Sequence, residues 1–121
     1  AALGGEVKIW ADVQKKHASH ALTADLGLAD LARGHAFSGA DALVVTGRET
    51  GGRTSIVDVR EARAAGIPVV VGSGVDTQDA RELSVYAEAL IVGSALKKGG
   101  EWRGEVELDR VRAIRQSIDG A

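Results

Sequence analysis

Cysteine is absent from this 121-residue chain, and proline occurs only once. The lack of cysteine excludes disulfides, thiolate metal sites and a cysteine nucleophile, and it fits a reducing compartment. No run approaches the roughly 20 apolar residues of a membrane span, and the amino terminus lacks the basic and apolar regions of a signal peptide. We therefore expect a cytoplasmic protein without a membrane span.

Charge of either sign is also not in excess. The formal net charge is -2, and the Lys and Arg residues are scattered along the chain. A nucleic-acid-binding protein needs a basic patch or stripe, so we expect no nucleic-acid partner. The composition, 45% hydrophobic and 26% charged, is ordinary for a globular protein. The length indicates a single domain over residues 1–121.

Hydrophobic segments of two kinds alternate along the chain. Alternating or continuous apolar runs predict strands over residues 6–13, 40–46, 68–71 and 89–92. Apolar residues at helical spacing predict helices over residues 23–39, 55–66, 77–87 and 109–118. The single proline, Pro68, falls at the start of the third strand, where a missing backbone donor is tolerated.

Strands that alternate with helices imply right-handed crossovers and a parallel sheet, and hence an α/β fold. Two architectures satisfy this pattern. The first is four successive βα units, equivalent to half of a TIM (βα)8 barrel, because a full barrel needs roughly 200 residues or more. The second is a small, flavodoxin-like doubly wound sheet.

The third and fourth predicted strands each end in Gly-Ser at a turn. We predict a phosphate site here because glycine allows close backbone approach, serine adds a hydroxyl donor and a following helix adds partial positive charge. Tight turns alone would also explain the Gly-Ser pairs. No GxxxxGK[ST] motif occurs, and a dinucleotide fingerprint fails at Thr77. The predicted phosphate-binding residues are Gly72, Ser73, Gly74, Gly93, Ser94 and Lys97.

Polar residues follow the first two predicted strands. Asp12, Lys16 and His17 could perform general acid/base catalysis or hold a divalent ion, or they could form a solvated polar loop. His17 and His20 alone do not make a recognised ligand set, so we predict no metal site. The second loop, with Thr46, Gly47 and Thr50, has hydroxyls for substrate contact and glycines typical of a flexible surface loop.

Four segments in order resemble the carboxyl-terminal half of the BtpA family of predicted TIM-barrel enzymes. They are VKIWADVQKKHA (7–18), ADALVVTGRETG (40–51), PVVVGSGV (68–75) and ALIVGSALKKGGEW (89–102). One member of that family is associated with photosystem I biogenesis. The resemblance implies that these units are strands five to eight of a barrel. It also implies a phosphate site after the last two strands, with Asp12, Lys16 and His17 at the mouth of the fifth.

Two functions follow as expectations. The first is an enzyme, or a fragment of one, that binds a phosphorylated small metabolite and performs an isomerase, lyase or transferase step, with no cofactor required by the sequence. The second is a noncatalytic assembly or stability factor that binds a protein partner. An isolated half-barrel would leave its sheet edges and barrel-facing layer uncovered, so we expect a homo-oligomer or a complementary half-barrel chain.

Overall fold

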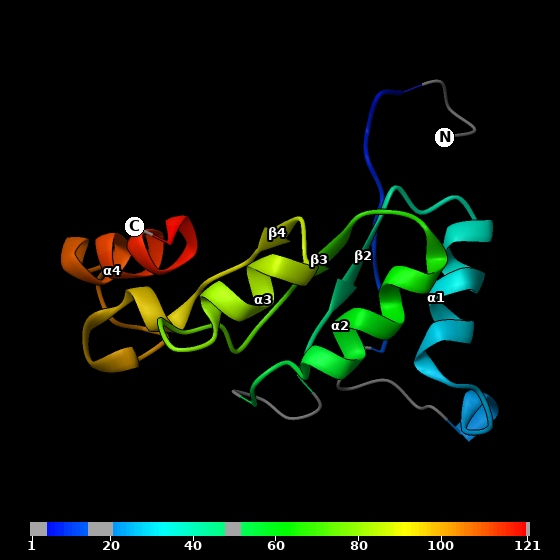
Figure 1. The fold of residues 1–121 in the computed structure, drawn as a ribbon, viewed down its shortest axis with the longest axis horizontal. Helices are drawn as coiled ribbons and strands as arrows, with labels where there is room; N and C mark the ends of the chain where they lie inside the picture. Colours follow the sequence, from blue (N-terminus) through cyan, green and yellow to red (C-terminus); the bar gives the residue numbers. More distant parts are fainter. Residues whose placement is uncertain (1–4, 15–20, 48–51, 121) are drawn as a thin grey trace.

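Four parallel strands form one sheet in the order β1-β2-β3-β4 (Figure 1). The structure is a computed structural model and describes residues 5–14, 21–47 and 52–120. The strands are Trp10–Asp12 (β1), Ala42–Val45 (β2), Val69–Val71 (β3) and Ala89–Leu90 (β4). The α-helices are Leu28–Phe37 (α1), Ile56–Ala62 (α2), Ala80–Tyr86 (α3) and Leu108–Asp119 (α4). Short 3-10 helices occupy Ala21–Thr23 (η1), Arg63–Ala65 (η2), Ser94–Leu96 (η3) and Lys98–Gly100 (η4). The predicted α/β class and parallel sheet are confirmed.

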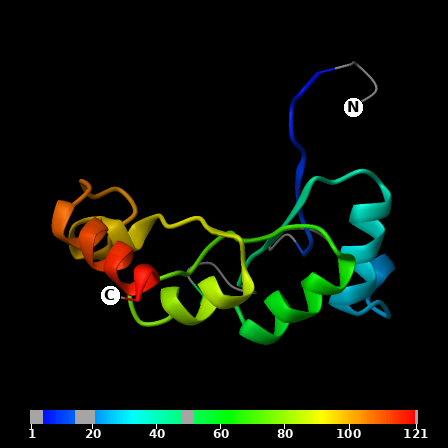
Figure 2. The same cartoon turned by 45° about the horizontal axis from the view of Figure 1, so that its top comes forward.

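All the crossover helices lie on one side of this sheet. Helix α1 contacts α2, α2 contacts α3 and α3 contacts α4, so that consecutive helices are neighbours. Figure 2 shows α1, α2 and α3 on the same side of the strands. The core lies between these helices and the strands. Its fully buried side chains include Leu43, Val45, Val69 and Val71 from the sheet and Val59 and Leu83 from the helices.

The opposite face of the sheet carries no helical layer within the described residues. Side chains alternate along a strand, so Trp10, Val44 and Ala89 point away from the helices. Trp10 is 53% exposed and Ala89 is exposed, while Val70 in the centre of the sheet is buried. We call this surface the open face. Sequential strand order with helices on one side favours a half-barrel, because a doubly wound sheet reverses its strand order and carries helices on both faces.

Helices α1 and α3 begin later than the sequence predicts, and α3 begins at Ala80 instead of residue 77. Helix α1 begins at Leu28, five residues later than predicted, because the chain first makes the turn η1 and then passes through extended Gly27. The helix predicted over residues 55–66 corresponds to α2 and η2, which end at Gly66 in the left-handed region at φ 72°. After β4 the chain forms only the short turns η3 and η4 before an antiparallel bridge joins Lys97 to Val106.

The strands are shorter than their hydrophobic runs. Residues 6–9 lie outside β1. The carbonyl oxygen of Ile9 accepts hydrogen bonds from the amides of Asp41 and Ala42, and the amide of Ile9 donates to the carboxylate of Asp41 at 2.8 Å. Within the described ranges, none of the helices has both the length and the apolar composition needed to cross a membrane.

Candidate functional site

A cleft of about 390 Å³ opens at the carboxyl ends of β3 and β4. Both predicted Gly-Ser turns line it, together with parts of the loop after β2. The lining residues are Arg53, Gly72, Ser73, Gly74, Val75, Asp76, Ile91, Gly93, Ser94 and Ala95. The sequence therefore identified two adjacent loops that the fold brings to one concave surface.

Neighbouring atoms exclude a side chain at two of the three glycines that line this cleft. A Cβ on Gly72 would lie 2.5 Å from Cγ1 of Val44, and a Cβ on Gly74 would lie 2.3 Å from the carbonyl oxygen of Gly52. Gly74 also has φ +69°, which L side chains rarely adopt. Gly93 has no atom within 4 Å of its hypothetical Cβ. Packing thus explains Gly72 and Gly74, whereas Gly93 leaves open space beside the cleft.

Five backbone amides of the two turns make no hydrogen bond with the described part of the chain. None of the hydrogen bonds among residues 5–14, 21–47 and 52–120 uses the amide N–H of Gly74, Val75, Gly93, Ser94 or Ala95. All five residues line the cleft. Successive free amides in a turn form a concave donor surface that suits an anion.

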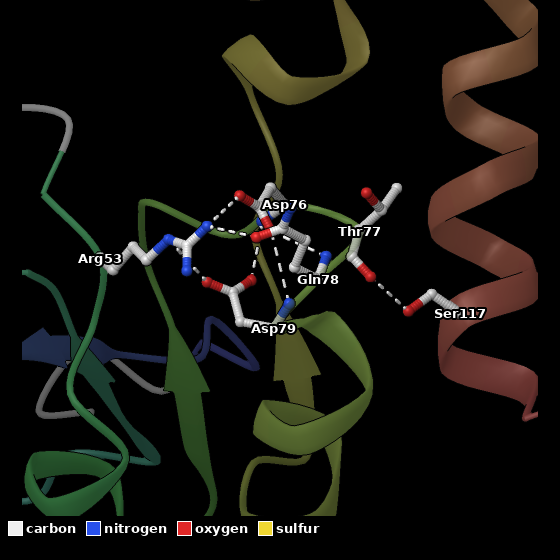
Figure 3. Close-up of polar contacts among 6 residues, drawn as sticks. All are labelled: Arg53, Asp76, Thr77, Gln78, Asp79 and Ser117. Carbon is white, nitrogen blue, oxygen red and sulfur yellow. Dashed lines mark hydrogen bonds and ion pairs between the residues drawn. The ribbon is translucent and has the colours of Figure 1, made fainter.

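An ion-pair network joins the loop after β2 to the segment before α3 (Figure 3). An Arg53 guanidinium nitrogen lies 2.9 Å from Oδ2 of Asp76 and donates to Oε1 of Gln78 at 3.0 Å. Its Nε lies 3.7 Å from Oδ2 of Asp79, within ion-pair range but beyond hydrogen-bond distance. A single guanidinium therefore faces two carboxylates at one wall of the cleft.

Asp76 organises the backbone before α3. Its Oδ1 accepts hydrogen bonds from the amides of Gln78 at 2.8 Å and Asp79 at 3.3 Å. Burial opposes ionisation of Asp76, but these two amides and the Arg53 guanidinium outweigh it and hold the pKa of the carboxyl below its ordinary value of 3.8. The ionised carboxylate thus stabilises both the turn and the contact with Arg53.

Neither a helix amino terminus nor Lys97, both predicted for the phosphate site, lies at the described cleft. Helix α3 begins at Ala80, well past Gly74, and only the turn η3 follows Gly93. Lys97 does not line the cleft, and its Nζ donates to the carbonyl oxygen of Trp102 instead. The described cleft therefore offers an anion backbone amides and the Ser94 hydroxyl rather than a helix dipole or a lysine.

The other predicted site residues lie at the carboxyl ends of β1 and β2, or outside the described part of the chain. Asp12 ends β1, and Thr46 and Gly47 follow β2. The amide of Gly47 donates to Oγ of Ser73 at 3.4 Å, so the second loop touches the cleft loop. The predicted residues Lys16, His17 and Thr50 lie outside the described residues. Within those residues, no group of three or more potential metal-ligating side chains is found.

Sequence reasoning missed Arg53 and Asp76. They are separated by 23 positions, and their pairing depends on how the two loops cross. The available signal was local: Asp76 precedes a helix by a few residues, where an aspartate commonly caps backbone amides.

Comparison with known proteins decides the family. The sequence model of the BtpA family matches residues 1–120. The chain belongs to the BtpA family. An uncharacterized protein of Pyrococcus abyssi is 37% identical over 120 residues, which cover 98% of this chain and 45% of the relative. An uncharacterized mitochondrial protein of Caenorhabditis elegans is 33% identical over 114 residues, covering 93% and 41% of the two chains.

One BtpA relative has a name that refers to a process. The photosystem I biogenesis protein BtpA of Synechocystis is 33% identical over 121 residues, which cover 96% of this chain and 41% of the relative. The chain thus spans less than half the length of the relatives described here.

Gly74→Ala should destabilise this BtpA-family chain by at least about 1–2 kcal/mol, because the left-handed backbone and the Gly52 carbonyl both oppose a Cβ. Urea denaturation measures the effect. The control is Gly34→Ala, in the interior of α1 with open space around it, which should stabilise the chain by about 0.5–1 kcal/mol. Changes of the same sign in both variants would contradict this account of the loop contact.

Asp76→Asn should reduce the dependence of stability on acid pH. The folded pKa of Asp76 is depressed, so its carboxylate contributes stability that is present above the unfolded pKa and is lost as pH falls through the folded pKa. The free energy of unfolding is measured by urea titration between about pH 6 and pH 2. Asp76→Asn should lose less stability across this window than the wild type. Parallel curves for the wild type and Asp76→Asn would contradict the assignment.

Proposed function

We propose that this chain binds a phosphorylated small metabolite in the cleft at the ends of β3 and β4. The observation that carries the proposal is the set of backbone amides that line the cleft and make no hydrogen bond within the described part of the chain. The N–H groups of Gly74 and Val75 come from one loop, and those of Gly93, Ser94 and Ala95 come from the next. Phosphate oxygens accept such hydrogen bonds, and an anion gains more from them than a neutral group does.

Directed amides, rather than net charge, provide the recognition. Arg53 is the cation that lines the cleft among the described residues, and it is shared between Asp76 and Asp79. A phosphate group therefore meets no unpaired positive charge at this wall. Such a site selects by geometry, since the donors are fixed by the strands that precede them, and it leaves the exposed hydroxyl of Ser94 as an additional contact.

We propose that the reaction also uses groups that this chain does not supply. In barrel enzymes, catalytic groups come from the ends of several strands, and this chain spans less than half the length of its relatives. We propose that it forms part of an enzyme with isomerase, lyase or transferase chemistry and that the described cleft supplies the phosphate anchor.

A second candidate is a noncatalytic assembly or stability factor. The open face favours it, because exposed apolar groups such as Trp10 and Ile91 are available to a protein partner. The Synechocystis relative named for photosystem I biogenesis is consistent with this candidate. A partner protein that competes with phosphate compounds for the chain would favour the second function over the first.

We further propose that four more βα units cover the open face. The strand edges of β1 and β4 are unpaired among the described residues, and the helical layer covers only the other face. A second copy of this chain supplies the required parallel strands in the isolated protein by a two-fold arrangement around the barrel axis.

Ser94→Glu should weaken phosphate binding, because a carboxylate would project from the loop that donates the amides of residues 93–95 and would repel the anion. Binding of inorganic phosphate and of a panel of sugar phosphates is measured by calorimetry and by protection against thermal unfolding. The matched control is Ser94→Gln, which has the same size without the charge. We expect Ser94→Glu to bind roughly tenfold or more weakly than Ser94→Gln. A wild-type chain that none of these compounds stabilises at millimolar concentration would contradict the proposed function.

Trp10→Arg should weaken assembly of the chain. Light scattering should give a mass near twice 12.5 kDa for the wild type and a monomer for Trp10→Arg, because the arginine places charge on the open face. Trp102→Arg is the control, since Trp102 is 63% exposed and lies beyond η4, away from the strands. A monomeric wild type, or dissociation by both variants alike, would overturn the proposed covering of this face.

A further inference from the structure

In the described part of the chain, two buried oxygen atoms near the cleft have no hydrogen-bond partner. They are Oδ1 of Asp12 and Oγ1 of Thr46. A third unpartnered oxygen among the described residues, Oδ2 of Asp79, has the Arg53 guanidinium nearby at 3.7 Å. Buried polar atoms are normally paired, because burial without a partner forfeits their hydrogen bonds to water. Asp12 and Thr46 therefore need an explanation that the packing of the described residues does not supply.

Both residues belong to the open face at the carboxyl edge of the sheet. Asp12 is in register with Val44, and Thr46 follows Val44 by two residues, so the side chains of Asp12 and Thr46 leave the sheet on the same side. Gly72 is the next neighbour across the sheet, and a Cβ there would lie 2.8 Å from Cγ2 of Thr46. Gly72 also lines the cleft. The two unpartnered oxygens thus lie on the same face as Gly72, on the neighbouring strands β2 and β1.

Building on the proposed function, we propose that the ligand is a phosphorylated polyhydroxy compound whose hydroxyl groups bind Asp12 and Thr46. A carboxylate oxygen only accepts hydrogen bonds, and a threonine hydroxyl both accepts and donates. The ligand must therefore present O–H donors toward Asp12, and a second anionic group at this position would be repelled. An apolar chain would leave both oxygens without partners.

The size of the ligand follows from the strand spacing. Neighbouring strands lie about 4.8 Å apart, so two spacings from the phosphate loop after β3 to Asp12 on β1 measure roughly 10 Å. A chain of about five carbons with a terminal phosphate spans this distance. Thr46, one strand from Gly72, meets the middle of such a ligand.

The ligand-free protein provides the first test. Thr46→Val removes an unpartnered hydroxyl with little change of shape, so it should raise Tm by about 2–5 °C. The matched control is Thr54→Val: Oγ1 of Thr54 donates to the carbonyl oxygen of Ser73 at 2.8 Å, and its loss should lower Tm. A lower Tm in both variants would overturn the assignment of Thr46 as a group held for a ligand.

Two phosphate esters provide the second test. Ribose 5-phosphate and pentyl phosphate share a phosphate on a five-carbon skeleton and differ in their hydroxyl groups. We expect the wild-type chain to bind ribose 5-phosphate roughly tenfold more tightly than pentyl phosphate, so that the ratio of the two dissociation constants is about ten. Thr46→Val and Asp12→Asn should narrow this ratio while leaving the affinity for inorganic phosphate unchanged.

The outcomes of the binding test distinguish failure of this inference from failure of the proposed function. Equal affinity of the wild type for the two esters would overturn the polyhydroxy ligand and leave the phosphate site standing. A ratio that neither variant narrows would overturn the roles of Asp12 and Thr46. Failure of inorganic phosphate and of both esters to bind would overturn the proposed function and this inference together.

Discussion

The close approach of the Gly52 carbonyl to Gly47 and Gly74 fixes the geometry of the candidate site. A Cβ at either Gly47 or Gly74 would lie 2.3 Å from this oxygen, so side chains are excluded where the loop after β2 meets the loop after β3. The residues that follow Gly52 are thereby brought against the second loop. Arg53 reaches Asp76, and Thr54 donates to the carbonyl oxygen of Ser73. One wall of the cleft depends on this contact between backbones.

The strand order determines which face of the sheet the helices cover and which face stays open. Successive parallel strands that pair in sequence place all their crossover helices on one side, and the buried valines of β2 and β3 pack against those helices. The open face then carries Trp10 beside the polar groups Asp12 and Thr46 at its carboxyl edge. An apolar layer and unpartnered oxygens on one surface fit an interior that further strands and a ligand complete.

Sequence patterns predicted the elements that local physics determines. Val69–Val71 reads as a buried strand because all three side chains are apolar, and all three are buried. The start of α1 was misplaced because the apolar spacing of residues 23–27 resembles a helix that Gly27 does not continue. The cleft loops were found from their glycines. The pairing of Arg53 with Asp76, and the contact of Lys97 with Trp102 O, arise from tertiary contacts that no local pattern contains.

Phosphate recognition by free backbone amides is the central claim, and an NMR titration of the ¹⁵N-labelled chain with inorganic phosphate tests it most directly. We predict saturable shifts of the amide signals of Gly74, Val75, Gly93, Ser94 and Ala95, the donors that line the cleft. The amide signals of Gly39 and Gly66, which lie before the amino-terminal ends of β2 and β3, should not shift. Shifts that do not saturate, or that centre away from the two cleft loops, would contradict the claim.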